Sequence, residues 1–111
     1  FIDVSSGGIS PLQKIALGPK YQVPLATEIK QGTGLPTMAV GLITTPAEAE
    51  GIVAEGEADM VALARGMLYD PRWPWHAAAE LGASVTAPRQ YWRSQPRGLS
   101  DLFKDAKTGM R

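Results

Sequence analysis

Cysteine is absent from the sequence of 111 residues, and histidine occurs once, as His76. The absence of thiols excludes disulfides and thiolate metal sites, and it is compatible with an intracellular, cytoplasmic setting. A second histidine that would complete a metal site or a catalytic dyad is also missing. We therefore expect no metal centre, and we interpret His76, in the interior of an expected helix, as a structural residue.

Net charge is lacking too, because 11 lysines and arginines balance 11 aspartates and glutamates. This composition provides no electrostatic attraction toward nucleic acid or an anionic membrane. No apolar run approaches the roughly 20 residues that span a bilayer, and the N-terminus has no signal-peptide layout. These absences predict a soluble protein with the length of one small domain, and neither nucleic acid nor a membrane as partner.

Three short apolar runs resemble β-strands, at residues 1–6, 37–44 and 60–64. The first run opens the sequence without a leading methionine or a polar segment, so we interpret the chain as a piece of a longer polypeptide. Helix-like segments follow each run. In residues 21–31 the apolar side chains recur near helical spacing, and Gly32 is the expected stop.

Stronger helix signals follow the second and third runs. Thr45, Pro46 and Glu48 predict a helix start with a capping box, in which Thr45 is the N-cap and Pro46 the first helical residue. The Asp-Pro pair at 70–71 predicts a further helix that ends at Gly82.

Alternation of strands and helices predicts an α/β fold with a parallel sheet covered by helices. Three strands suffice for a small open sheet, or they form the last part of a (β/α)8 TIM barrel, which needs about 250 residues. The beginning inside a strand favours the barrel. We assign residues 1–88 to this barrel portion and residues 89–111 to an extended C-terminal tail, with a short helix over 99–106.

The carboxyl ends of parallel strands form the functional face of such folds. Here those ends carry SSGG at 5–8, GLIT at 41–44 and ARG at 64–66. Small residues, glycine and outward amide groups suit an anion, and Arg65 adds a charged fork for phosphate oxygens.

Two interpretations of these strand ends stay open. In the first, Gly41-Leu42 and Ala64-Arg65 form the phosphate site that often follows the seventh and eighth strands of a barrel. In the second, the glycines serve ordinary turns, and Arg65 is solvated or paired with a carboxylate such as Asp70.

An aromatic pair with an arginine, Tyr91-Trp92-Arg93, stands in the C-terminal segment. It is either a surface anchor or a group that reaches over a pocket or a neighbouring subunit. Trp73 and Trp75 we interpret as packing residues of the last helix.

The motifs DVSSGG, YQVPLATEIK, AVGLIT, EADMVALARGMLYDPRWPWHAA and APRQYWR, in this order, resemble the C-terminal part of the old yellow enzyme family. The similarity is greatest to the bacterial NADPH-dependent ene-reductases of the thermophilic-like branch, and it runs from Phe1 to Arg93. It implies an FMN-containing (β/α)8 barrel, of which this chain supplies strands six to eight.

The resemblance also implies which residues bind the cofactor. Backbone amides at Gly41, Leu42 and Ala64, together with the Arg65 side chain, are expected to bind the FMN phosphate. Many relatives carry glycine at the position of Ala64, and a backbone amide contact survives that difference.

Partners and reaction follow from the same resemblance. A Q-Y-x-R pattern, matched by Tyr91 and Arg93, implies an arginine that enters the active site of a neighbouring subunit in a homodimer or homotetramer. The catalytic histidine pair and tyrosine are expected in the missing N-terminal portion of the barrel, so this chain contains no catalytic residue. The implied reaction passes hydride from NADPH or NADH through FMN to the activated C=C bond of small enones. From the residues alone, a non-catalytic assembly module or another phosphate-binding barrel enzyme remains an alternative.

Overall fold

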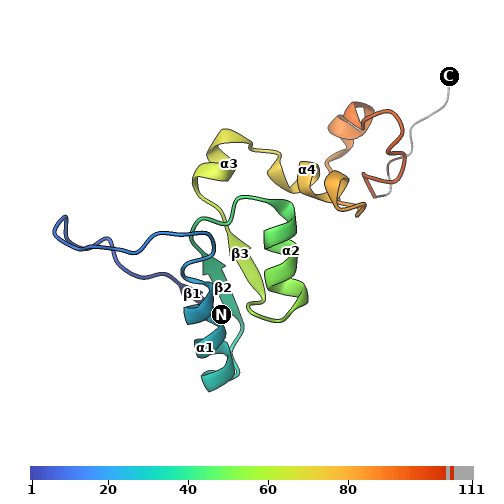
Figure 1. Cartoon of the computed structure of the whole chain (residues 1–111). Coiled ribbons are helices and arrows are strands. Elements are labelled where there is room, and N and C mark those ends of the chain that lie inside the picture. Colours follow the sequence, from blue (N-terminus) through green and yellow to red (C-terminus); the bar gives the residue numbers. More distant parts are fainter. Residues whose placement is uncertain (105, 107–111) are drawn as a thin grey trace. The chain divides into compact units, whose positions relative to one another are not determined.

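Parallel strands and covering helices make up the part of the chain that the computed structural model describes, residues 1–104 and 106 (Figure 1). The chain divides into two compact units, with the boundary between Tyr69 and Asp70. The first unit contains β1 (Ile2–Val4), α1 (Val23–Thr33), β2 (Thr37–Val40), α2 (Pro46–Ala54), β3 (Met60–Ala62) and α3 (Arg65–Tyr69). The second contains α4 (Trp73–Glu80) and the 3-10 helix η1 (Arg89–Ser94).

The sheet of the first unit has the strand order β1-β2-β3, and both pairings are parallel. The predicted parallel α/β arrangement is thus confirmed for these three strands. β2 ends at Val40, earlier than predicted, because the next two residues have positive φ angles, 118° at Gly41 and 50° at Leu42. β3 likewise ends at Ala62, shortly before the unpredicted helix α3 begins at Arg65.

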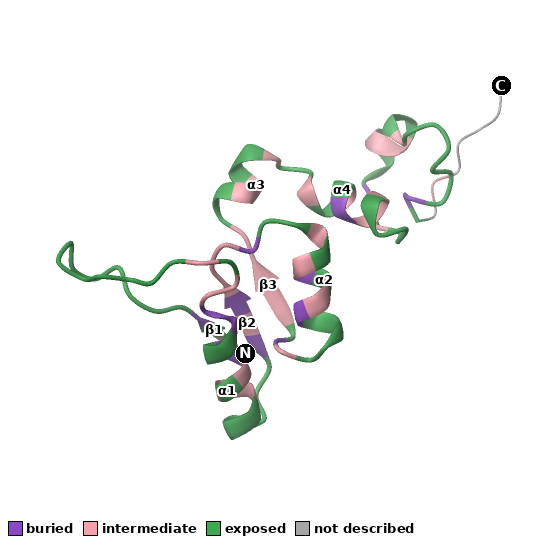
Figure 2. Cartoon of the chain, in the orientation of Figure 1, coloured by how far each residue is buried: buried purple, intermediate pink, exposed green. Residues whose placement is uncertain are grey.

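Helices α1 and α2 bury their apolar sides in the first unit, and β2 is its most buried strand (Figure 2). Val23 and Ala26 of α1, Ala39 of β2 and Ile52 of α2 are at most 1% exposed. Burial of such aliphatic side chains is the main driving force for folding. This packing also sets where the strand ends lie, because α1 connects β1 to β2 and α2 connects β2 to β3.

The helix ends were predicted with mixed success. The capping box of α2 is confirmed, since the Thr45 hydroxyl accepts the amide hydrogen of Glu48 at 3.2 Å and the Glu48 carboxylate accepts that of Thr45 at 3.1 Å. The stop predicted at Gly32 is wrong. α1 continues through Gly32 and ends at Gly34, which has a left-handed φ of 72° and donates its N–H to the Lys30 carbonyl.

Helix α4 of the second unit starts two residues later than predicted. The Asp70 carboxylate accepts the backbone N–H of Arg72, the N-cap, and the helix begins at Trp73. Its predicted end is confirmed, because Gly82 has a φ of 67° just after the last turn.

The C-terminal segment is folded where an extended tail was expected. Val85 pairs with Phe103 in an isolated parallel bridge, and Phe103 joins Ala87 and Leu102 in a buried cluster against Trp75. The helix predicted over 99–106 is absent from the described residues of that range, since its backbone is engaged in this pairing instead. Residues 105 and 107–111 of the predicted tail lie outside the described part.

Candidate functional site

A hollow of about 530 Å³ lies at the carboxyl ends of the three strands of the first unit. Its volume is in the range of small-molecule sites. The loops after β1, β2 and β3 all contribute to its wall, as do residues just before α1. The lining residues are Ser5, Ser6, Leu17, Tyr21, Gln22, Val40, Gly41, Leu42, Ile43, Thr44, Ala62, Leu63, Ala64, Arg65 and Gly66. The four residues predicted for phosphate binding are therefore brought together around one hollow.

The loop after β2 has a backbone that only glycine permits at its first position. Gly41 has a φ of 118°, and a Cβ atom there would lie 2.7 Å from Cε1 of Tyr21 and 2.8 Å from Nε2 of Gln22. Leu42 follows with a φ of 50°. Among the described residues, the N–H groups of Leu42 and Ile43 find no hydrogen-bond acceptor. Successive amides with unsatisfied donors in such a turn are typical of anion-binding concavities.

Arg65 follows β3 on the same wall and is exposed. The alternative in which a neighbouring carboxylate neutralises it is not supported by the ion pairs. Asp59 binds Nζ of Lys30 at 3.0 Å, and the Asp70 carboxylate contacts Nδ1 of His76 at 2.6 Å. No ion pair of Arg65 occurs in the part of the chain that the structure describes. Its guanidinium is therefore available to an anion.

Tyr21 and Gln22 are wall residues that the sequence did not single out. Both precede α1, and Gln22 is only 4% exposed. A buried glutamine has no pattern of its own in a sequence, because its burial depends on contacts with distant segments.

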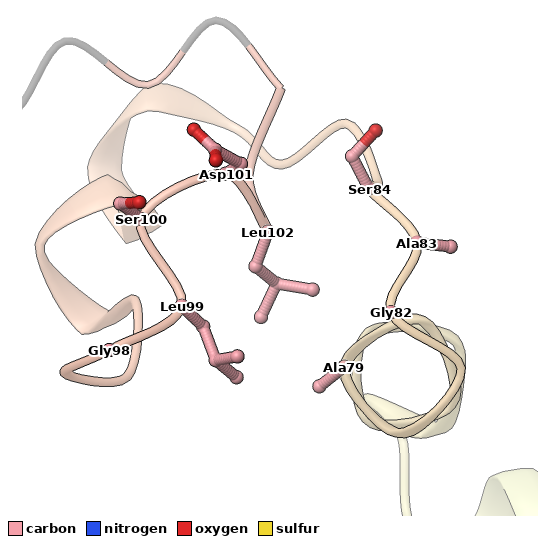
Figure 3. A pocket seen from close by; sticks show the side chains of 9 residues that line it. All are labelled: Ala79, Gly82, Ala83, Ser84, Gly98, Leu99, Ser100, Asp101 and Leu102. Atoms are coloured by element: carbon pink, nitrogen blue, oxygen red, sulfur yellow. The ribbon is translucent and has the colours of Figure 1, made fainter.

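A second hollow, of about 380 Å³, lies in the second unit between the C-terminal end of α4 and residues 98–102. Figure 3 shows Leu99 and Leu102 pointing into it toward Ala79, while Ser100 and Asp101 point away. Its lining residues include the acidic Asp101 and no basic residue. This hollow therefore lacks the positive charge that Arg65 supplies to the first hollow.

Aromatic packing fixes η1 within the second unit. The Trp75 ring makes edge-to-face contacts with Tyr91 and with Phe103, at centroid distances of 5.4 and 5.0 Å. The Arg72 guanidinium lies 5.1 Å from the centroid of the Tyr91 ring. Trp75 is thus the packing residue that we expected. Arg93 is exposed on η1.

The described part of the chain contains neither a metal-ligand cluster nor a helix that could span a membrane. Within residues 1–104 and 106, no three or more histidine, aspartate and glutamate side chains are grouped so as to hold a metal ion. No helix of the described part is long and apolar enough to cross a membrane.

Comparison with known proteins identifies the family. The sequence model of the NADH:flavin oxidoreductase / NADH oxidase family matches residues 12–83, which include the loops after β2 and β3. The chain belongs to this family. Curated relatives include NADPH dehydrogenases from Geobacillus thermodenitrificans, with 49% identity over 92 residues, and from Halalkalibacterium halodurans, with 45% over 93 residues.

These alignments cover 83% and 84% of this chain but 27% of each relative. The chain thus spans about a quarter of the length of the curated relatives that it matches. The family assignment made from the sequence motifs is confirmed. The flavin oxidoreductase family has a TIM-barrel fold, and the described residues contribute three adjacent parallel strands with their helices rather than a closed barrel.

Proposed function

We propose that the chain is the C-terminal part of an FMN-dependent NAD(P)H oxidoreductase and that its strand-end hollow holds the phosphate end of FMN. One observation carries the proposal. The loops after β2 and β3, both inside the segment matched by the flavin family, meet around a hollow. Among the described residues, the Leu42 and Ile43 amides there have no acceptor and Arg65 has no carboxylate partner.

The residues present fit a phosphate group. Gly41 permits a turn in which Tyr21 and Gln22 pack where a side chain would otherwise lie, and the N–H groups of Leu42 and Ile43 have no acceptor among the described residues. Ala64 is proposed to contact the phosphate through its backbone N–H group, so its side-chain methyl group takes no part in that contact. The Arg65 guanidinium adds charge-assisted hydrogen bonds to phosphate oxygens. FMN, when bound, supplies the hydride chemistry, and this chain binds and orients its phosphate.

The proposed reaction reduces the activated C=C bond of a small α,β-unsaturated carbonyl compound, with NADPH or NADH as the electron donor. One hydride from the nicotinamide and one proton are added across the double bond, and NADP⁺ or NAD⁺ is released. The residues that bind the carbonyl group and supply the proton are proposed to belong to the remaining portion of the same barrel. The family match disfavours the alternative of an unrelated phosphate-binding barrel enzyme.

Assembly belongs to the same proposal. We place Tyr91 and Arg93 at the contact with a neighbouring subunit of a homodimer or homotetramer, where Arg93 completes the substrate pocket. Its support is the exposure of Arg93 on the short helix η1, whose neighbour Tyr91 is held by Trp75.

The decisive experiment is an Arg65→Ala substitution in the assembled barrel, by which we mean this chain together with the remaining barrel strands. Loss of charge-assisted hydrogen bonds worth about 1.5–3 kcal/mol corresponds to an increase of roughly ten- to a hundredfold in the Kd for FMN. The Kd is measured by titrating apoprotein with FMN and following flavin fluorescence. Arg97→Ala is the matched control, because Arg97 is exposed and does not line the hollow.

Two results would overturn the proposal. An assembled barrel that binds no flavin excludes the oxidoreductase function. An FMN affinity that is the same in the Arg65→Ala variant and the unchanged protein excludes the phosphate site.

A further inference from the structure

We infer that Gln22 is a positioning residue for this site, because its side chain ties the loop after β1 to Val40, the last residue of β2, and thereby presents the phosphate-binding amides of the following turn. The inference rests on the proposed function, in that the hollow is taken to bind the phosphate of FMN. Gln22 itself is assigned no contact with the cofactor.

The Gln22 amide joins two strand ends that are far apart in the sequence. Oε1 accepts hydrogen bonds from the backbone N–H and from the hydroxyl of Ser6, the latter at 3.1 Å, and Nε2 donates to the carbonyl of Val40 at 3.2 Å. The backbone N–H of Ser6 can only donate and the carbonyl of Val40 can only accept. These two partners therefore determine which end of the amide is oxygen and which is nitrogen.

The same amide shapes the glycine turn. Val40 precedes Gly41 directly, and Nε2 of Gln22 occupies the space that a side chain at Gly41 would need, 2.8 Å from an ideal Cβ position. Cε1 of the Tyr21 ring lies 2.7 Å from the same ideal Cβ position. Because the Val40 carbonyl is held, the direction in which the chain leaves β2 is held as well. That direction decides where the N–H of Leu42 points.

Both ends of the glutamine amide are required for this role. A side chain of equal length without polar atoms fills the space but leaves the Ser6 N–H and the Val40 carbonyl unpaired at a site where Gln22 is 4% exposed. A shorter amide does not span the two strand ends. The inference therefore predicts that methionine and asparagine both fail at this position.

The experiment compares Gln22→Met in the assembled barrel with Gln31→Met. Gln31 lies in α1, the helix that Gln22 precedes as N-cap, is exposed and does not line the hollow, so it controls for the substitution itself. Apoprotein is titrated with FMN and, separately, with riboflavin, which has the same ring system without the phosphate. We expect the Kd for FMN to rise about tenfold in Gln22→Met, as for one buried hydrogen-bonded contact, and the Kd for riboflavin to change less than about twofold.

Each outcome decides the matter. An unchanged Kd for FMN in Gln22→Met, with a raised Kd in Arg65→Ala, overturns this inference and leaves the proposed function intact. An equal loss of FMN and riboflavin binding also overturns it, because a general loss of structure weakens both ligands alike. If neither Gln22→Met nor Arg65→Ala changes FMN binding, the proposed function itself fails. Should Gln22→Met not fold, Gln22→Asn is tested by the same ratio and must show the same selective loss.

Discussion

Replacing Gly41 by alanine tests whether the turn after β2 is shaped by its neighbours or merely tolerates glycine. The substitution adds one methyl group at a backbone position with a φ of 118°. An ideal Cβ atom there lies 2.7 Å from Cε1 of Tyr21 and 2.8 Å from Nε2 of Gln22, closer than van der Waals contact allows. Gln22 cannot move away without losing its hydrogen bond to the Val40 carbonyl.

Two costs add up at this position. A non-glycine residue in a sparsely populated backbone region costs about 1–3 kcal/mol. Overpacking a well-filled site typically costs a further 1–3 kcal/mol. Gly56→Ala is the matched control, because Gly56 also has a positive φ, 73°, but no atom within 4 Å of its Cβ position. It carries the backbone cost alone, about 1–2 kcal/mol.

Urea denaturation of the assembled barrel without flavin measures both losses of unfolding free energy. We expect the loss in Gly41→Ala to exceed that in Gly56→Ala by about 1–3 kcal/mol. We also expect only Gly41→Ala to weaken FMN binding, since the turn that it disturbs carries the Leu42 amide. Equal losses in the two variants, with unchanged FMN affinity, would refute the reasoning that Tyr21 and Gln22 enclose Gly41.

Three further predictions concern other parts of the chain. Thr45→Ala removes the capping box with Glu48 and should lower the unfolding free energy by about 1 kcal/mol in urea denaturation; no loss would mean that the box does not stabilise α2. The pKa of Asp59 is lowered from its ordinary value of 3.8 by the hydrogen bond from the Thr37 amide and by Lys30. The ionised Asp59 carboxylate therefore stabilises the folded protein fully above pH 3.8, and this contribution is lost as pH falls through the lowered pKa of the folded state. Asp59→Asn should therefore make stability less dependent on pH below about pH 4, and an unchanged acid profile would contradict this. Arg93→Ala should raise the KM for an enone substrate or weaken oligomerisation, whereas Arg97→Ala should change neither; no effect of Arg93→Ala would show that Arg93 is only solvated.

The tertiary contacts of the C-terminal segment determine how the role of Arg93 can be tested. Deletion of everything after Ala87 would remove Leu102 and Phe103, which form a buried cluster with Ala87 and pack against Trp75. Such a truncation destabilises the second unit whether or not Arg93 acts at a neighbouring pocket. A point substitution is therefore the informative change.

Local signals made the start of α2 and the family predictable. Thr45 and Glu48 satisfy each other's backbone groups across three residues, so the start of α2 depends on neighbours in the sequence alone. The alternation of apolar runs with helices indicated a parallel sheet, because strands buried on both faces read as continuous apolar segments. Gly32 misled the prediction of the end of α1, since a glycine is tolerated inside a helix and only the left-handed Gly34 ends it.

The sequence by itself determined the order of the three strands and of α1, α2 and α4, the positions of small residues and an arginine at the strand ends, and the flavin oxidoreductase family. Only the tertiary structure decided that Gln22 joins Ser6 to Val40, across 16 and 18 residues, and that Lys30 occupies the Asp59 carboxylate. The physical reason is the range of the interaction. Caps and turns are set by adjacent residues, whereas the partner of a buried amide or of a charge is set by which distant segments the core brings together.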